Sequence, residues 1–286
     1  MSHPAGPPAA PAVCVRHPDR PTGLACTRCG RPACTDCLRE ASVGYQCVDC
    51  VAEGSRGVRR GTTVAGARSA GRGRPVVTFT LIALNLLVFV VTIVQARSVL
   101  EVDRADLFDE WVLVPGYVAQ GEWWRLLTSG FLHFGLVHIA LNMVALWMLG
   151  QQIEPVLGRW RFLATYLIAL LGGSAACMLF YPVNGGVAGA SGAVFGLLGA
   201  YLVVLIRMRL PVSMIMPTIF INVVISVVVP GIALLAHLGG ALAGAAATAA
   251  IVYVPRTNRT ALQTALLGGL TVLVVVLSVL GAARFF

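Results

Sequence analysis

Charged residues are scarce in this chain of 286 residues. Asp, Glu, Lys and Arg together make up 12% of it, lysine is absent, and the mean hydropathy is +0.82. Soluble proteins carry about twice as much charge, so the composition excludes that class and indicates a membrane protein with several spans. The first 75 residues also lack an apolar run, and we therefore expect no signal peptide.

Seven apolar runs approach the length of about 20 residues that spans a bilayer as a helix. They lie at 76–96, 132–150, 162–181, 190–206, 212–229, 232–253 and 261–282. The sequence therefore predicts an all-α polytopic membrane protein, with a small polar domain ahead of the first span.

Arginines mark alternate connections between these runs. They lie before the first run and after the second, fourth and sixth, at Arg74, Arg159, Arg161, Arg207, Arg209, Arg256 and Arg259. The connection at 97–131 is rich in acidic residues, and those at 182–189 and 230–231 carry no charge. Because basic loops stay on the cytoplasmic side, we expect a cytoplasmic N-terminus and an extracytoplasmic C-terminus. The second, fourth and sixth runs then all begin near the outer leaflet.

Seven of the eight cysteines lie within residues 14–50, in close pairs. One Cys-x2-His pair and three Cys-x2-Cys pairs are formed by Cys14, His17, Cys26, Cys29, Cys34, Cys37, Cys47 and Cys50. Eight ligands suffice for two tetrahedral zinc sites, and so small a segment has too little core to fold without metal. A disulfide framework is the alternative, which the odd cysteine count and a reducing compartment disfavour. We therefore predict a domain over 14–52 that binds two structural zinc ions.

The spacing of these pairs resembles B-box-type and RING-like cross-braced zinc fingers. That resemblance implies one ion on the first and third pairs and the other on the second and fourth, with sequential pairing as the alternative. The domain would be structural or would bind a cytoplasmic protein partner. On either side of it, residues 1–13 are expected to be a disordered leader and residues 53–75 a basic flexible linker.

Polar residues within the apolar runs are few, and they cluster near one depth. Such groups are costly in a membrane and are usually functional. Ser191 lies between glycines at the start of the fourth run, and His237 lies early in the sixth. His138 and Asn142 are four residues apart in the second run, so they project from one face of a helix.

Ser191 and His237 have the chemistry of a nucleophile and its base. A serine hydroxyl needs a base to accept its proton, and imidazole has a suitable pKa. No Asp or Glu lies at a similar depth, so the sequence predicts a dyad without a third member. Phe195, one turn beyond Ser191, could stack on the imidazole and fix it. The alternative is that Ser191 is a small residue that only serves helix packing.

Small residues favour close contact between the two helices that carry this pair. Gly192 and Gly196 are four residues apart in the fourth run, as are Gly240 and Gly244 in the sixth. Such pairs let helix backbones approach closely. Packing through these glycines would bring the serine hydroxyl within reach of the imidazole.

Residues 76–255 resemble a rhomboid intramembrane serine protease. The motifs that carry the resemblance follow in order: Trp124-Arg125, His133, His138, Asn142, Glu154, Gly158, Gly189-Ala190-Ser191-Gly192 and Ala236-His237. The resemblance covers about 180 residues and implies a six-helix core, to which residues 256–286 add a seventh transmembrane helix. It implies Ser191 as nucleophile and His237 as general base.

The same resemblance implies an oxyanion site made by Asn142 and His138. The loop that contains Trp124 and Arg125 would lie in the outer leaflet, and His133 would brace that loop. The family commonly has tyrosine where Phe195 stands, so ring stacking is kept and a phenol hydrogen bond is lost. Glu154 is expected to make structural hydrogen bonds outside the chemistry. The supporting residues are His133, Trp124, Arg125, Gly189, Gly192 and Phe195.

These residues favour a serine-type endopeptidase that hydrolyses peptide bonds in or near transmembrane segments of membrane-protein substrates. Its partners would be those substrates and the lipid bilayer, and catalysis would need no cofactor. A scaffold that only recognises transmembrane helices is the alternative, although inactive rhomboid relatives lack the serine, the histidine or both. A transporter is disfavoured because no inverted repeat or acidic ion site is evident. No nucleic acid is expected as a partner, since the arginine-rich linker lacks interleaved aromatic residues.

Overall fold

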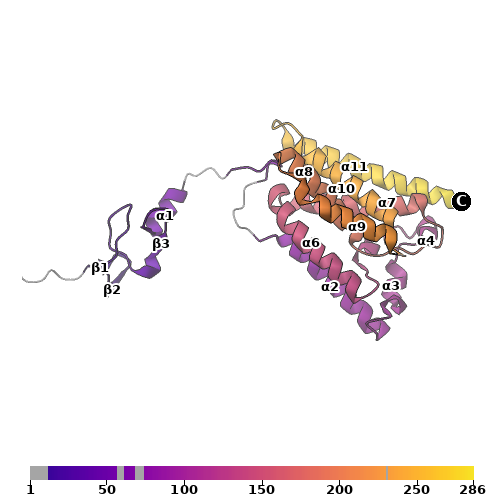
Figure 1. Ribbon diagram of the computed structural model, residues 1–286, viewed down its shortest axis with the longest axis horizontal. Coiled ribbons are helices and arrows are strands. Elements are labelled where there is room, and N and C mark those ends of the chain that lie inside the picture. Colours follow the sequence, from indigo (N-terminus) through magenta and orange to yellow (C-terminus); the bar gives the residue numbers. More distant parts are fainter. Residues whose placement is uncertain (1–11, 57–60, 68–73, 230) are drawn as a thin grey trace, which may run out of the picture. The chain divides into compact units, whose positions relative to one another are not determined.

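The computed structural model describes residues 12–56, 61–67, 74–229 and 231–286. It divides into two compact units, Met1–Arg60 and Gly61–Phe286 (Figure 1). Most of the leader predicted at 1–13 lies outside the described residues. So do 57–60 and 68–73, which belong to the linker predicted at 53–75.

The first unit consists of two small hairpins and a short helix. Strands β1 (Val13–Cys14) and β2 (His17–Pro21) pair in an antiparallel manner, as do β3 (Leu38–Glu40) and β4 (Tyr45–Cys47). The 3₁₀ turn η1 (Thr35–Cys37) precedes β3, and helix α1 (Val48–Ser55) follows β4. The buried cluster contains six cysteines but only Ala33 and Leu38 besides. An apolar core of that size cannot stabilise a domain by itself.

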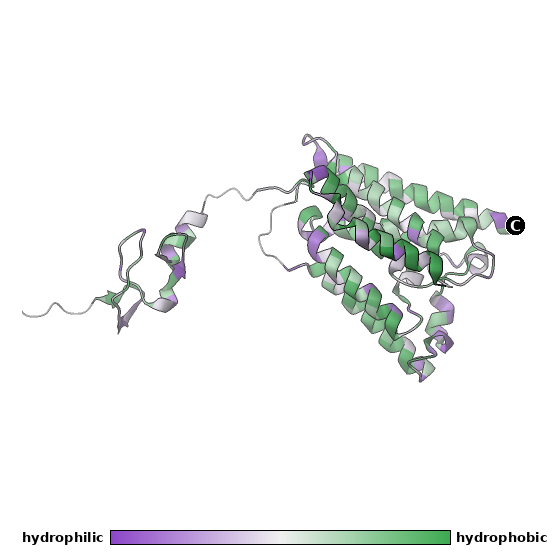
Figure 2. Cartoon of the chain, in the orientation of Figure 1, coloured by the Kyte–Doolittle hydropathy of each residue, from purple (hydrophilic) through white to green (hydrophobic). Residues whose placement is uncertain are grey.

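In the second unit, six of the described helices are long and apolar enough to cross a membrane. They are α2 (Val76–Ala96), α6 (Leu136–Leu157), α7 (Arg159–Phe180), α8 (Ser191–Met208), α10 (Leu234–Val252) and α11 (Arg259–Ala282). Most of the length of these helices has the green of hydrophobic residues in Figure 2. The all-α polytopic fold predicted from the sequence is therefore confirmed.

The helix of the fifth apolar run is shorter than predicted. The run at 212–229 forms the 3₁₀ turn η4 (Val212–Met214) and then α9 (Met216–Val228), which has 13 residues. Pro217 occupies the first turn of α9, where proline is favoured, and fixes the start of the helix. Val229 precedes Pro230 in the sequence and has extended dihedrals, as expected before proline. Prolines therefore limit α9 at both ends.

The second span also starts later than its hydropathy predicts. The run was expected from residue 132, but α6 begins at Leu136. The residues before it form the 3₁₀ turn η3 (Ser129–Phe131) and a short loop that ends at Gly135. His133 therefore lies in the loop that precedes α6 and not within the span, because apolar character alone does not distinguish a buried loop from a helix.

Short helices fill the connection between α2 and α6. They are η2 (Val102–Arg104), α3 (Asp106–Trp111), α4 (Pro115–Ala119) and α5 (Arg125–Thr128). An isolated β-bridge pairs Leu113 in this connection with Val187 in the loop ahead of α8. Two loops that are far apart in the sequence are thereby joined.

Helices α7, α8 and α10 are packed through glycines. Figure 1 shows α10 beside α8 and α7. A Cβ added at Gly240 would overlap the carbonyl group of Gly192, and one added at Gly244 would overlap that of Gly196. The two small-residue pairs noted in the sequence therefore face one another. We refer to this α7–α8–α10 contact as the glycine seam.

Helix α2 is attached to α6 through a buried carboxylate. Glu154 Oε1 accepts a hydrogen bond from the Val77 N–H at 3.0 Å, and Oε2 accepts from the Thr78 N–H at 2.8 Å and the Thr78 hydroxyl at 2.7 Å. The first N–H groups of a helix have no acceptor within the helix, and a carboxylate there also interacts favourably with the helix dipole. Glu154 therefore caps α2 from the far end of α6.

Residues 61–67 pack against the same end of the helices. The Thr63 hydroxyl donates to the Val156 carbonyl at 2.6 Å, and the Gln263 side-chain amide donates to the Ala65 carbonyl at 3.0 Å. Ala65 and Gln263 are fully buried. This segment belongs to the predicted flexible linker, and its hydrogen bonds and burial differ from that expectation.

Candidate active site

The serine and histidine singled out in the sequence lie next to one another across the glycine seam. Ser191 is the first residue of α8, and His237 lies in the first turn of α10. The distance from Ser191 Oγ to His237 Nε2 is 2.8 Å, which is a normal hydrogen bond. The pair therefore has the geometry that general-base activation of a serine requires.

The imidazole of His237 is supported by an aromatic ring. The ring centroids of Phe195 and His237 are 4.0 Å apart, with 11° between their planes. Phe195 is one turn beyond Ser191 on α8, so the helix that carries the serine also carries the ring that orients its histidine. Both rings are buried.

A second serine, which the sequence reasoning missed, contacts the other nitrogen of the same imidazole. Ser226 on α9 has its Oγ 2.8 Å from His237 Nδ1. The sequence predicts no third member because it offers no carboxylate at this depth. The available signal was a hydroxyl on the helix directly before α10, which is a weak signal because serines in apolar helices commonly bond to their own backbone.

His138 lies against Gly189, two residues before Ser191. A Cβ built at Gly189 would come within 2.7 Å of His138 Cε1 and 2.8 Å of His138 Nε2, and it would lie 3.6 Å from Ser191 Oγ. Gly189 also has a φ of +129°, which side-chain-bearing residues rarely adopt. Glycine at position 189 therefore leaves the space in which the imidazole edge reaches the serine.

Asn142 is on the same face of α6 as His138. Its side-chain Nδ2 donates to the His138 carbonyl at 2.9 Å. An amide group carries two N–H donors, so this bond leaves one for another acceptor. The Phe134 N–H lies 3.4 Å from His138 Nδ1, which turns the Nε2 side of that ring toward Gly189.

His133 is fully buried and lies against His138. The two ring centroids are 5.0 Å apart in an edge-to-face arrangement. Neither ring nitrogen of His133 has a hydrogen-bond partner among the described residues. The bracing role implied for His133 therefore stays a prediction, and the observed contact is between the two rings.

Arg125 organises the connection between α2 and α6. Its guanidinium donates to the backbone carbonyls of Asp109 and Val112 and pairs with Glu122, whose Oε2 accepts from Nε at 2.6 Å. Trp124 is half exposed and donates from Nε1 to the Glu110 carbonyl at 3.1 Å. The Trp-Arg pair therefore fixes the shape of this loop.

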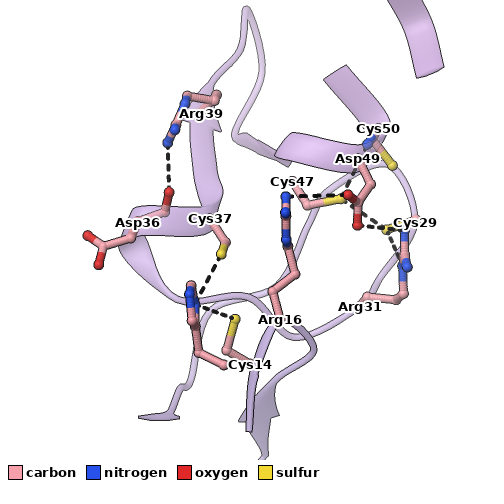
Figure 3. A network of polar contacts seen from close by, with 11 residues as sticks. Cys14, Arg16, Cys29, Arg31, Asp36, Cys37, Arg39, Cys47, Asp49 and Cys50 are labelled. Atoms are coloured by element: carbon pink, nitrogen blue, oxygen red, sulfur yellow. Dashed lines mark hydrogen bonds and ion pairs between the residues drawn. The ribbon is translucent and has the colours of Figure 1, made fainter. Parts of the chain in front are cut away.

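The eight predicted metal ligands form two groups in the first unit. One contains Cys14, His17, Cys34 and Cys37, and the other contains Cys26, Cys29, Cys47 and Cys50. Figure 3 shows Cys14 and Cys37 in one place, and Cys29, Cys47 and Cys50 in the other. The first group joins the first and third close pairs and the second group joins the second and fourth, so the grouping is the cross-braced one and not the sequential one.

The distances within these groups suit a tetrahedral zinc ion. His17 Nδ1 lies 3.8, 3.4 and 3.3 Å from the sulfurs of Cys14, Cys34 and Cys37, and the sulfurs of Cys29 and Cys47 are 3.8 Å apart. Zinc–ligand bonds of tetrahedral sites separate neighbouring ligand atoms by about 3.5–3.8 Å. Thiolate and imidazole are also the ligands that zinc prefers.

Backbone hydrogen bonds in the hairpins favour thiolates. The N–H of Cys34 lowers the pKa of the Cys14 thiol to about 6, and the N–H of Cys47 does the same for Cys26. Zinc binds cysteine as thiolate, so each group contains a thiol that favours the metal, whereas burial raises the pKa of Cys37 to about 11 and that of Cys50 to about 12.

The serine–histidine pair lies in a part of the chain that resembles known rhomboid proteases. A family model of the rhomboid domain matches residues 120–254. The chain is 38% identical over 192 residues to rhomboid protease GluP of Bacillus subtilis (strain 168), covering 63% of this chain and 35% of GluP. It is 35% identical over 178 residues to YdcA, a rhomboid relative from the same organism, covering 59% of this chain and 85% of YdcA.

Rhomboid protease AarA of Providencia stuartii is 28% identical over 218 residues, which cover 66% of this chain and 77% of AarA. The chain belongs to the rhomboid family. It spans about a third of the length of GluP but most of YdcA.

Proposed function

We propose that this protein hydrolyses peptide bonds in or near the transmembrane segments of other membrane proteins, with Ser191 as nucleophile and His237 as general base. The observation that carries the proposal is the 2.8 Å contact between Ser191 Oγ and His237 Nε2 in a member of the rhomboid family. The two groups come from different helices that touch through glycines, so their contact is a product of the fold.

The reaction proceeds in two stages. Ser191 Oγ attacks the carbonyl carbon of the scissile bond while its proton passes to His237 Nε2. The tetrahedral intermediate collapses, the C–N bond breaks, and the leaving amine takes the proton from Nε2. Water then gives a proton to Nε2 as its oxygen attacks the acyl ester. The C–Oγ bond of the second tetrahedral intermediate breaks and Oγ takes the proton from Nε2, which releases the carboxylic acid and restores Ser191.

In this proposal three donors bind the oxyanion of each tetrahedral intermediate. His138 Nε2 lies at Gly189 beside the serine, the second amide N–H of Asn142 is available, and Ser191 supplies a backbone N–H at the start of α8. One such donor contributes on the order of 3 kcal/mol to catalysis. The dipole of α8 adds to the same field.

The arginine pattern supports one orientation in the membrane. The N-terminus is cytoplasmic, the C-terminus is extracytoplasmic, and the site opens near the outer leaflet. A reporter enzyme that is active only outside the cytoplasm tests this: fused after Phe286 it should be active, and fused ahead of Met1 it should be silent.

A serine-reactive fluorophosphonate probe tests the catalytic assignment. Purified wild-type protein should be labelled, and Ser191→Ala and His237→Ala should each lose labelling. Ser278→Ala is the matched control, since Ser278 is a buried serine whose hydroxyl bonds to the Val274 carbonyl of its own helix. Labelling that persists in Ser191→Ala, or a folded wild type that stays unlabelled, contradicts the proposal.

The first unit holds two structural zinc ions in this proposal, and metal analysis of the full chain tests both their number and their pairing. Wild type and Cys177→Ser should contain two zinc ions per chain. Cys14→Ser with Cys34→Ser removes ligands from one cross-braced group and should lose one ion, whereas Cys14→Ser with Cys26→Ser should lose both. Sequential pairing gives the reverse result, and a disulfide framework gives no zinc in the wild type.

A further inference from the structure

The Ser226 hydroxyl of helix α9 contacts the proposed catalytic histidine. Ser226 is the single buried side chain in Met216–Val228, all of which the structure describes. Its Oγ lies 2.8 Å from His237 Nδ1 and 2.7 Å from the Asn222 carbonyl oxygen. The other side chains of α9 are exposed or partly exposed, with Ile219 and Val223 partly buried against the core, so Ser226 is the one fully buried residue of this helix.

The direction of these hydrogen bonds follows from counting protons. A hydroxyl has one proton, and a carbonyl oxygen can only accept. The Ser226 proton is therefore given to the Asn222 carbonyl, and the hydrogen bond between Ser226 and His237 must use a proton on Nδ1. A neutral imidazole with its proton on Nδ1 has an unprotonated Nε2, which is the atom that faces Ser191 Oγ.

We infer that Ser226 is a positioning residue that holds His237 in the tautomer able to act as a base, an inference that rests on the proposed function. The bonds form one chain with a single sense: Ser191 O–H to Nε2, Nδ1–H to Ser226 Oγ, and Ser226 O–H to the Asn222 carbonyl. The opposite tautomer would place a proton on Nε2, and Ser191 could not transfer its own proton there.

Ring stacking alone cannot make this selection. Phe195 fixes the plane of the imidazole, but the two neutral tautomers have the same planar shape and stack on it equally well. A partner on one edge distinguishes the two ring nitrogens, as an acceptor on Nδ1 does in serine proteases. Ser226 supplies this partner as a neutral oxygen, in a region where a carboxylate would be costly to bury.

The inference is tested with the full chain in lipid, using 15N-labelled histidine and magic-angle-spinning NMR. A protonated and an unprotonated ring nitrogen give well-separated signals, and the His237 signals are assigned by their loss in His237→Ala. Wild type should show His237 with a proton on Nδ1 and none on Nε2. A resting wild-type His237 with its proton on Nε2 overturns the inference, and this measurement needs no substrate.

Kinetics of a transmembrane model substrate in proteoliposomes provide the second readout. Ser226→Ala should lower kcat by about tenfold or more, the range for loss of a hydrogen bond that acts on the reacting group, with KM changed by less than about twofold. Ser226→Thr keeps the hydroxyl and should restore most of kcat and the wild-type NMR pattern. Ser278→Ala is the matched control, because Ser278 is a buried serine on another helix whose hydroxyl donates to the Val274 carbonyl and takes no part in this chain of hydrogen bonds.

Failure of this inference is distinguishable from failure of the proposed function. If Ser226→Ala is folded and cleaves at the wild-type kcat, Ser226 has no positioning role although the protease assignment stands. If wild type neither cleaves nor binds the fluorophosphonate probe, the proposed function is contradicted, whatever tautomer the NMR spectrum reports.

Discussion

The two sides of His237 are built in different ways. On one side, the glycine seam brings the backbones of α7, α8 and α10 into direct contact, so the position of the histidine is set by groups that cannot move separately. On the other side, α9 contributes one buried hydroxyl. The seam fixes where the proposed base lies, and in our inference α9 specifies which of its nitrogens carries a proton. Position and protonation are therefore supported by separate parts of the bundle.

The largest expected effect comes from breaking the seam. In Gly244→Leu the new side chain would meet the backbone of Gly196, which cannot yield as a side chain can, so the cost should exceed the roughly 1–3 kcal/mol typical of overpacking. We expect a large fall in the unfolding temperature in detergent and loss of probe labelling.

Gly268→Leu on α11 is the control for that variant, because nothing lies within 4 Å of a Cβ at this position. Replacing an open helical glycine should leave stability unchanged or slightly raised. Similar destabilisation in both variants would mean that the loss comes from the substitution itself and not from the seam.

An intermediate effect is expected when the ring on the seam side of His237 is removed. Phe195→Leu keeps an apolar side chain but loses ring stacking, which contributes about 0.5–1.5 kcal/mol or roughly 2–12-fold. The measurement is kcat on the model substrate, with Phe195→Tyr as the variant that keeps the stack. Equal kcat in Phe195→Leu and wild type would show that the seam positions the base without the ring.

The smallest effects should come from the outer surface of α9. Phe220 and Val228 are 68% and 70% exposed, and in a bilayer such side chains face lipid. Phe220→Ala and Val228→Ala should each leave kcat within about twofold of wild type, because neither side chain is buried within the protein. A loss as large as that of Ser226→Ala would show that α9 acts through its apolar surface.

The same contrast explains which features the sequence could reveal. The seam glycines of α8, and likewise those of α10, are four residues apart in the sequence. Ser191 and His237 stand out because polar groups are rare in apolar runs. Ser226 has no such signature, since it also makes the ordinary bond of a membrane serine to the carbonyl four residues back. Its contact with His237 depends on where the short helix α9 packs against α10. Hydropathy does not predict that position.

The sequence predicted the ligand groups of the small domain, but it did not predict the packing of residues 61–67 against the helices. Cysteine spacing predicts four close pairs directly, because two ligands two residues apart can face one ion. The resemblance to cross-braced fingers anticipated which pairs meet, since the first and third pairs form one group and the second and fourth the other. Residues 61–67 had the composition of a linker, but small residues can also enter narrow spaces, as the burial of Ala65 illustrates.

The cap that Glu154 places on α2 also bears on the order of synthesis. Pro75 at the start of α2 provides no side-chain cap, and the carboxylate that binds Thr78 comes 76 residues later. At about 5–20 residues per second, a newly made α2 waits roughly 4–15 s for that carboxylate. Until the end of α6 has been translated, the N–H groups of Val77 and Thr78 at the start of α2 lack the carboxylate that accepts their hydrogen bonds in the folded protein. The α2–α6 hairpin is therefore the earliest unit of this bundle that can be completed while the chain is still on the ribosome.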